Sequence, residues 1–285
     1  MDRKAAAEKL MSLQAMIEGY MKKGTAASER YVGTSRGNIR VLEYGFDTRD
    51  KRPLYVDIHG GGWALLFPEF DEKINLQILE KTNVRIISMD YPKAPKNPYP
   101  AGIEAVYEVI KHYYENAEEY GIDRSNVGVG GYSSGGNFAT VACMMAKERK
   151  DFKIKYQVMC YPGTDAAEGA YIKPKSEHGI TNEDIEAFEL CYVEDPKDAK
   201  LPYVSPVYAT KEQLTGLPPA LMIIAGPGDP LSPEDLRYAK NLREAGVPLE
   251  QYEFERAYHG FMQNDEPDAE EAIAILIDFI KKHTE

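Results

Sequence analysis

The chain has 285 residues, 43% of them hydrophobic and 28% charged, so it can bury one large core and is not disordered as a whole. Its formal net charge of −12 argues against nucleic acid as a partner, because an acidic surface repels phosphate groups. Its three cysteines, Cys143, Cys160 and Cys191, are scattered, which fits free thiols better than a disulfide scaffold or a metal site.

The N-terminal segment carries apolar residues at helical intervals and predicts a helix over about 3–23. It lacks the unbroken apolar stretch and the small-residue cleavage site of a signal peptide. The longest apolar runs, such as 220–225, are too short to cross a bilayer. We therefore expect a cytoplasmic protein without a membrane anchor.

Short β-rich runs then alternate with longer helical patterns. Strands are expected at 54–58, 84–89, 126–130, 156–160, 221–225 and 249–254, and helices at 102–114, 137–149, 182–192, 233–244 and 268–282. This alternation predicts a mostly parallel sheet with helices on both faces. The helix at 3–23 and the segment 165–212 interrupt the alternation, and such insertions commonly form a lid or cap. Alternatively, the first helix pads an edge of the sheet.

A run of glycines, His59-Gly60-Gly61-Gly62-Trp63, directly follows the first of these strands. Glycines let backbone N–H groups approach a ligand closely, and such donors stabilise the negatively charged oxygen of a tetrahedral intermediate. A flexible linker is a poor alternative, because the run follows a buried strand and ends in the only tryptophan of the chain. We expect His59 to brace the loop rather than to act as a base.

The pattern G-x-S-x-G occurs at Gly131-Tyr132-Ser133-Ser134-Gly135, between an expected strand and an expected helix. A sharp strand-to-helix turn needs glycines beside the serine, because side chains there would collide. Such a turn exposes the Ser133 hydroxyl and directs the N–H of Ser134 toward a bound carbonyl oxygen. An ordinary turn rich in small residues is the alternative reading of the pentapeptide alone.

An acid and a base follow in the order that a serine hydrolase of this topology requires. Asp229 comes after the strand at 221–225, and His259 comes after the strand at 249–254. The carboxyl ends of parallel strands lie at one edge of a sheet, so both loops can meet Ser133. We predict Ser133 as the nucleophile, His259 as the base and Asp229 as the residue that orients it. The nearby Glu234 and Asp235 fall inside the next expected helix.

Taken together, these motifs resemble the hormone-sensitive-lipase group of esterases within the α/β-hydrolase superfamily. The resemblance covers nearly the whole chain from about residue 40. It rests on His59 to Gly62, Asp90-Tyr91, Ala94-Pro95, 98–101, 131–137, Ser205-Pro206, 217–220, 229–231 and 259–261. Tyr132 departs from the family pattern, which has Asp or Thr before the nucleophile.

The resemblance implies one α/β-hydrolase domain over 1–285, with an eight-stranded, mostly parallel sheet. It also implies a helical cap formed by about 1–40 and 165–212. The oxyanion hole of the family falls on Gly61, Gly62 and Ser134. We expect Trp63 and Tyr132 to contact the substrate, and cap aromatics such as Phe188, Tyr192 and Tyr203 either line a pocket or belong to the core.

The function expected from these features is the hydrolysis of short-chain acyl esters through an acyl-enzyme intermediate, without a cofactor or a metal. Cleavage of amides or peptides on the same residues is an alternative. A non-catalytic receptor for a small ligand is another, although such receptors lose the catalytic histidine. The partner is therefore a small acyl ester, and the sequence leaves a homodimer open.

Overall fold

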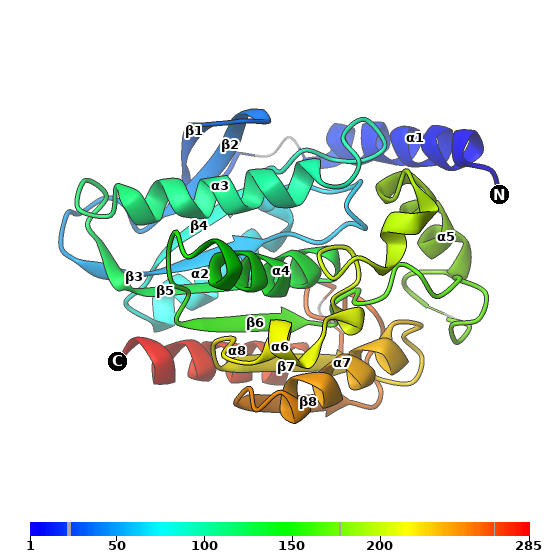
Figure 1. The fold of residues 1–285 in the computed structure, drawn as a ribbon. Coiled ribbons are helices and arrows are strands. Elements are labelled where there is room, and N and C mark those ends of the chain that lie inside the picture. The colour runs from blue at the N-terminus through cyan, green and yellow to red at the C-terminus, as the bar shows by residue number, and fades with distance from the viewer. Residues whose placement is uncertain (22–23, 177, 265) are drawn as a thin grey trace.

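The computed structural model describes residues 1–285 except 22–23, 177 and 265 (Figure 1). In the described residues, eight strands form one sheet in the order β1-β2-β4-β3-β5-β6-β7-β8. The strands are β1 (Ser28–Thr34), β2 (Gly37–Tyr44), β3 (Arg52–Ile58), β4 (Arg85–Met89), β5 (Ile122–Tyr132), β6 (Tyr156–Cys160), β7 (Ala220–Ala225) and β8 (Leu249–Phe254). Strand β2 runs antiparallel to both β1 and β4, and the other pairs are parallel.

Helices cover both faces of the sheet. One layer contains α2 (Glu72–Lys81) and α8 (Ala269–Thr284), and the other contains α3 (Ala101–Glu115), α4 (Ser134–Arg149) and α7 (Ser232–Glu244). Strands β4, β6 and β7 are buried along their full length, which explains their nearly continuous apolar sequences. The predicted fold, a mostly parallel eight-stranded sheet between helical layers, is confirmed.

Two further helices, α1 (Arg3–Met21) and α5 (Asn182–Tyr192), pack against each other beyond the carboxyl ends of the parallel strands (Figure 1). Lys9 of α1 joins them, because its ammonium group lies 2.8 Å from Asp184 and 3.0 Å from Glu183. The amide oxygen of Gln14 accepts a hydrogen bond from the N–H of Leu66, at 3.0 Å. Helix α1 is thus bound to the loop after β3 as well as to α5.

The segments around these helices differ in detail from what the sequence predicts. Residues 28–34, part of the segment expected to be cap, form strand β1 of the sheet. The last residues of the expected helix, 22–23, lie outside the described residues. Short helical turns occupy much of the chain between α5 and β7: Pro196–Lys200, Pro206–Tyr208 and α6 (Lys211–Leu214).

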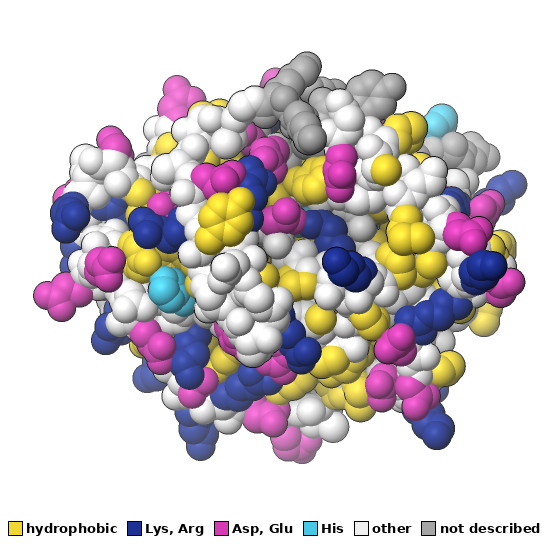
Figure 2. Space-filling model, turned by 90° about the horizontal axis from the view of Figure 1, so that it is seen from above, with side chains coloured by type: hydrophobic (Ala, Val, Ile, Leu, Met, Phe, Trp, Pro, Cys, Tyr) yellow, Lys and Arg dark blue, Asp and Glu magenta, His cyan; other side chains and the backbone are white. Residues whose placement is uncertain are grey.

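The surface mixes charges of both signs. Figure 2 shows acidic and basic side chains interspersed over the edge of the molecule that carries α1 and β1. Among the described residues, no helix combines the length and the apolar character that a membrane crossing requires. The cytoplasmic location and the homodimer stay predictions.

Two buried carboxyl groups lie beneath the sheet edge where the loops gather. Asp57 on β3 accepts hydrogen bonds from the Asn75 amide at 2.9 Å and from the Ser88 hydroxyl at 2.7 Å, both at the same oxygen. Burial raises the pKa of Asp57 to about 6. Burial and the negative charge of Asp57 raise the pKa of Asp71 well above its usual range. Folding therefore binds protons at this pair.

A raised carboxyl pKa predicts a specific dependence of stability on pH. The stability that the Asp57 proton contributes is fully present below about pH 3.9, the usual Asp pKa, and is lost as the pH rises through about 6. Replacing Asp57 by Asn removes this loss. We expect the stability of Asp57→Asn relative to the wild type to increase by about 1 kcal/mol between pH 5 and pH 8, measured by urea unfolding.

Asp123 provides a matched control for this measurement. Its carboxylate is partly exposed, and hydrogen bonding to Ser125 holds its pKa below the usual range, so it is ionised at both pH values. Asp123→Asn should therefore show the same stability difference at pH 5 and pH 8. An equally flat difference for Asp57→Asn would contradict the assignment of a proton to Asp57.

Candidate active site

Ser133 occupies a tight turn between β5 and α4. Its backbone has φ 52° and ψ −122°, a conformation that residues other than glycine rarely adopt. The flanking glycines allow the turn to approach β3: a Cβ atom at Gly135 would lie 1.9 Å from the carbonyl oxygen of Ile58, and one at Gly131 would lie 2.5 Å from it. Only glycine fits at these two positions, which agrees with the turn expected from the sequence.

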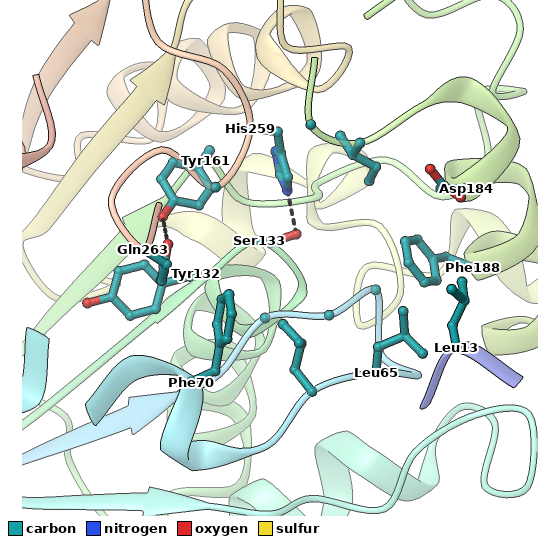
Figure 3. Close-up of a pocket in the computed structure, with 17 residues that line it drawn as sticks. Leu13, Leu65, Phe70, Tyr132, Ser133, Tyr161, Asp184, Phe188, His259 and Gln263 are labelled. Atoms are coloured by element: carbon teal, nitrogen blue, oxygen red, sulfur yellow. Dashed lines mark hydrogen bonds between the residues drawn. The ribbon is translucent and has the colours of Figure 1, made fainter. Parts of the chain in front are cut away.

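The structure brings Ser133 together with Asp229 and His259. The Ser133 hydroxyl oxygen lies 2.8 Å from Nε2 of His259 (dashed in Figure 3), and Nδ1 of His259 lies 2.9 Å from Oδ2 of Asp229. Asp229 is fully buried, and its other oxygen accepts the N–H of Leu231 at 2.9 Å. A proton on Nδ1 that points to the carboxylate leaves Nε2 free to accept the serine proton.

The loop that carries His259 is held by a side chain that the sequence analysis did not identify. The amide nitrogen of Gln263 donates to Asp71 at 2.7 Å, and its amide oxygen accepts the hydroxyl of Tyr161 at 2.6 Å. The Tyr161 ring meets the His259 ring edge-on, with centroids 5.2 Å apart. Gln263 therefore ties the histidine loop to the segments after β3 and β6.

Backbone donors surround the Ser133 side chain. A Cβ atom at Gly60 would lie 3.3 Å from Cβ of Ser133, so the glycine run passes directly beside the serine. Gly61 and Gly62 have φ values of 108° and 59°, and Ser134 is the first residue of α4. Within the described chain, the N–H groups of these three residues donate to no protein acceptor. They are available to a bound oxygen, which is the property that an oxyanion hole requires.

A cavity of about 390 Å³ opens above Ser133 and His259, and we call it the large cavity (Figure 3). Its walls are mainly apolar and come from α1, the loop after β3, α5 and the segment just before α5: Leu13, Leu65, Leu66, Phe70, Ile180 and Phe188. Tyr132, Tyr161 and Gln263 line its other end. Tyr132, which is expected to contact the substrate, thus borders the large cavity, and its phenol has no hydrogen-bond partner in the described structure.

Trp63, the other residue expected to contact substrate, lines a different space. It borders a cavity of about 20 Å³ that also reaches Ser133, and we call this one the small cavity. Trp63 is 7% exposed, and its indole ring stacks on Tyr192 with ring centroids 4.3 Å apart. Tyr192 thus belongs to the core, whereas Phe188 lines both cavities. Tyr203 bonds to Glu148 and borders neither cavity.

Glu234 and His59 have partners away from Ser133, whereas Asp235 is fully buried and neither of its carboxyl oxygens has a hydrogen-bond partner in the described structure. Glu234 pairs with Lys173 and accepts the N–H groups of Thr164 and Asp165, at 2.6 and 2.9 Å. His59 is fully buried against Tyr91, and burial lowers its pKa well below the usual range. These contacts agree with a bracing role for His59. The described residues contain no group of His, Cys, Asp or Glu side chains arranged to hold a metal ion.

Comparisons with known proteins agree with this geometry. A family model described as the α/β-hydrolase fold matches residues 55–263. The carboxylic ester hydrolase LipN of Mycobacterium tuberculosis is 34% identical over 79% of this chain, which spans 61% of LipN. A putative α/β hydrolase of Acanthamoeba polyphaga mimivirus, R526, is 31% identical over 83% of this chain and 70% of its own length.

Solved structures extend the likeness to almost the full chain. The esterase of Pyrobaculum calidifontis superposes with a TM-score of 0.86 at 28% sequence identity. The superposition covers 99% of this chain and 93% of the esterase chain. A thermostable esterase from Pseudomonas putida gives a TM-score of 0.86 at 26% identity, with 100% and 91% covered. The chain therefore belongs to the α/β-hydrolase family, in the group that resembles hormone-sensitive lipase.

Proposed function

We propose that the chain is a serine carboxylesterase that hydrolyses esters of short acyl groups. The observation that carries the proposal is the continuous hydrogen-bonded path from Asp229 through His259 to the Ser133 hydroxyl, inside a cavity that reaches free backbone donors. The esterase names of the related proteins support ester bonds as the target.

The path supports a two-step reaction. The Ser133 oxygen attacks the ester carbonyl carbon while His259 takes the hydroxyl proton. The carbonyl oxygen becomes negatively charged and accepts hydrogen bonds from the N–H groups of Gly61, Gly62 and Ser134. His259 then gives the proton to the leaving alcohol, and an acyl group remains on Ser133. Water attacks this acyl-enzyme with His259 as base, which releases the acid and restores the serine.

The helices α1 and α5 act as a cap in this proposal. They supply Leu13 and Phe188 to the large cavity and are joined by the ion pairs of Lys9. An apolar cover limits the access of bulk water to the acyl-enzyme and strengthens hydrogen bonds to the charged oxygen.

The nucleophile is tested by replacing Ser133. We expect Ser133→Ala to lower kcat/KM for p-nitrophenyl acetate by at least about three orders of magnitude, because it removes the attacking oxygen but leaves the fold intact. The exposed Ser125→Ala serves as the control and should keep the wild-type rate. Equal activity in Ser133→Ala would show that another group attacks. If the wild type and the Ser125→Ala control cleave only the matching anilide, and Ser133→Ala does not, the chain is an amidase.

The positioning role of Gln263 is tested with a charge. In Gln263→Glu the new carboxylate faces the buried Asp71, whose pKa is already raised, so the two groups repel once both are ionised. We expect the ratio of the variant's kcat to the wild-type kcat to fall at least about tenfold as the pH rises from 5 to 8, because the repulsion shifts the histidine loop.

A matched change elsewhere separates this effect from a general response to charge. Gln251 on β8 donates to Glu253 at 2.6 Å outside the large cavity, so Gln251→Glu also places two carboxylates side by side. Its kcat relative to the wild type should not depend on pH. A ratio for Gln263→Glu that is equally flat would show that Gln263 does not hold the histidine loop in its reactive position.

A further inference from the structure

Two cavities of very different size meet at Ser133. The large cavity measures about 390 Å³ and the small cavity about 20 Å³. Twenty cubic ångströms is on the scale of a single water molecule, which is also about the size of a methyl group. The two cavities share Gly62, Ser133, Ile180 and Phe188, but His259 lines only the large one and Ser134 only the small one.

The chemistry of ester cleavage decides which half of a substrate each cavity receives. The leaving oxygen must take its proton from Nε2 of His259, so the alcohol half lies on the side of the imidazole. The charged oxygen points to the backbone N–H groups of the glycine run and of Ser134. The fourth substituent of the tetrahedral carbon is the first carbon of the acyl chain. It takes the direction that remains, away from His259 and toward the small cavity.

Rigid groups close the small cavity. The Trp63 ring stacks on Tyr192 and also lies close to Gly163. The side chain of Leu231 lies close to Gly163 as well. Lys173 and Glu234 also line the small cavity; their side chains are only 2% and 1% exposed and form an ion pair.

The ion pair itself is anchored to other parts of the chain. Lys173 also donates to the carbonyl oxygen of Asp165 at 2.7 Å and lies 3.6 Å from Glu189 of α5. Glu234 holds two backbone N–H groups of the loop after β6. An acyl chain longer than acetyl would have to displace these buried charges with methylene groups, which cannot replace their hydrogen bonds.

We propose that the substrates are acetyl esters of bulky apolar alcohols: the small cavity limits the acyl group to about one methyl, and the large cavity binds the alcohol. The inference rests on the proposed esterase function and narrows its substrate class. The large cavity suits such an alcohol, because Phe70 and Tyr161 offer aromatic faces at one end and Leu65 and Phe188 offer apolar surface at the other (Figure 3).

The proposal is tested on the wild-type protein with two substrate series. In the first, the alcohol is fixed as p-nitrophenol and the acyl group grows from acetyl to butyryl and hexanoyl. We expect kcat/KM to fall at least about tenfold from acetyl to butyryl, since a group that exceeds a packed space forces its walls apart. A butyryl or hexanoyl ester that reacts as fast as the acetyl ester would overturn the proposal.

In the second series, the acyl group is fixed as acetyl and the alcohol grows from ethyl to butyl and 2-phenylethyl. These primary alcohols are similar as leaving groups, so differences report on binding. We expect kcat/KM to rise at least about tenfold from ethyl to 2-phenylethyl acetate, because apolar surface is buried. No rise would overturn the assignment of the large cavity. If no ester is cleaved in a Ser133-dependent way, the esterase function itself fails, whereas Ser133-dependent cleavage with a longer acyl preference refutes only this inference.

Variants of the residues that line the small cavity test whether its walls limit the length of the acyl group. Leu231→Ala enlarges the small cavity and should raise the butyryl-to-acetyl ratio of kcat/KM about tenfold. Leu231→Val, a smaller truncation, should shift the ratio in the same direction if the alanine variant does not fold. Leu65→Ala is the matched control, because Leu65 lines only the large cavity, and it should leave the ratio unchanged. An unchanged ratio in folded Leu231 variants would overturn the proposal.

Discussion

The close approach of the β5–α4 turn to the end of β3 is the constraint on which the site depends. The carbonyl oxygen of Ile58 comes so near to Gly135 that no side chain fits there. This contact places the first N–H of α4 next to the glycine run that continues from Ile58. Ser133 stands between them in a strained conformation that the packed turn maintains. Donors from two loops thus lie beside one hydroxyl.

Buried polar contacts fix the loops that apolar packing alone would leave free to rotate. On one side of Ser133, Gln263 joins the histidine loop to Asp71 and Tyr161. On the other side, Lys173 joins α5 to α7 through Glu189 and Glu234. Hydrogen bonds and ion pairs are directional, so each contact sets an orientation as well as a distance. Both sit within the walls of the cavities.

Much of the fold follows from the sequence pattern. Strands β4, β6 and β7 read as short apolar runs, because a parallel strand covered on both faces of the sheet buries every residue. The hairpin of β1 and β2 has no such signal: its outer strand is mostly exposed, and Arg30 and Arg40 pair with Glu43 and Glu29 across it. The sequence pattern does not predict helix α2 either, since only Ile74, Asn75 and Ile78 are buried along its ten residues.

The candidate site divides in the same way. Motifs identify Ser133, Asp229 and His259, because each follows a strand in a fixed order and all three meet in space. No motif indicates Gln263 or Lys173. Their partners Asp71 and Glu234 lie 192 and 61 residues away in sequence. Trp63 was expected at the substrate, but the sequence gives no measure of the space beside it. Such contacts depend on how loops from different strands fold over one another.

The buried ion pair of Lys173 has a consequence for engineering this protein. Truncating Lys173 alone would leave the Glu234 carboxylate buried without its cation, and truncating Glu234 alone would also release the N–H groups of Thr164 and Asp165. Changing this wall therefore requires coordinated exchanges, such as Lys173→Met with Glu234→Gln and Glu189→Gln, in which the amide oxygen at 234 still accepts both N–H groups and no carboxylate loses its cation. The width of this wall is thus a property of several positions that must change together, and truncating one of them alone is expected to destabilise the fold.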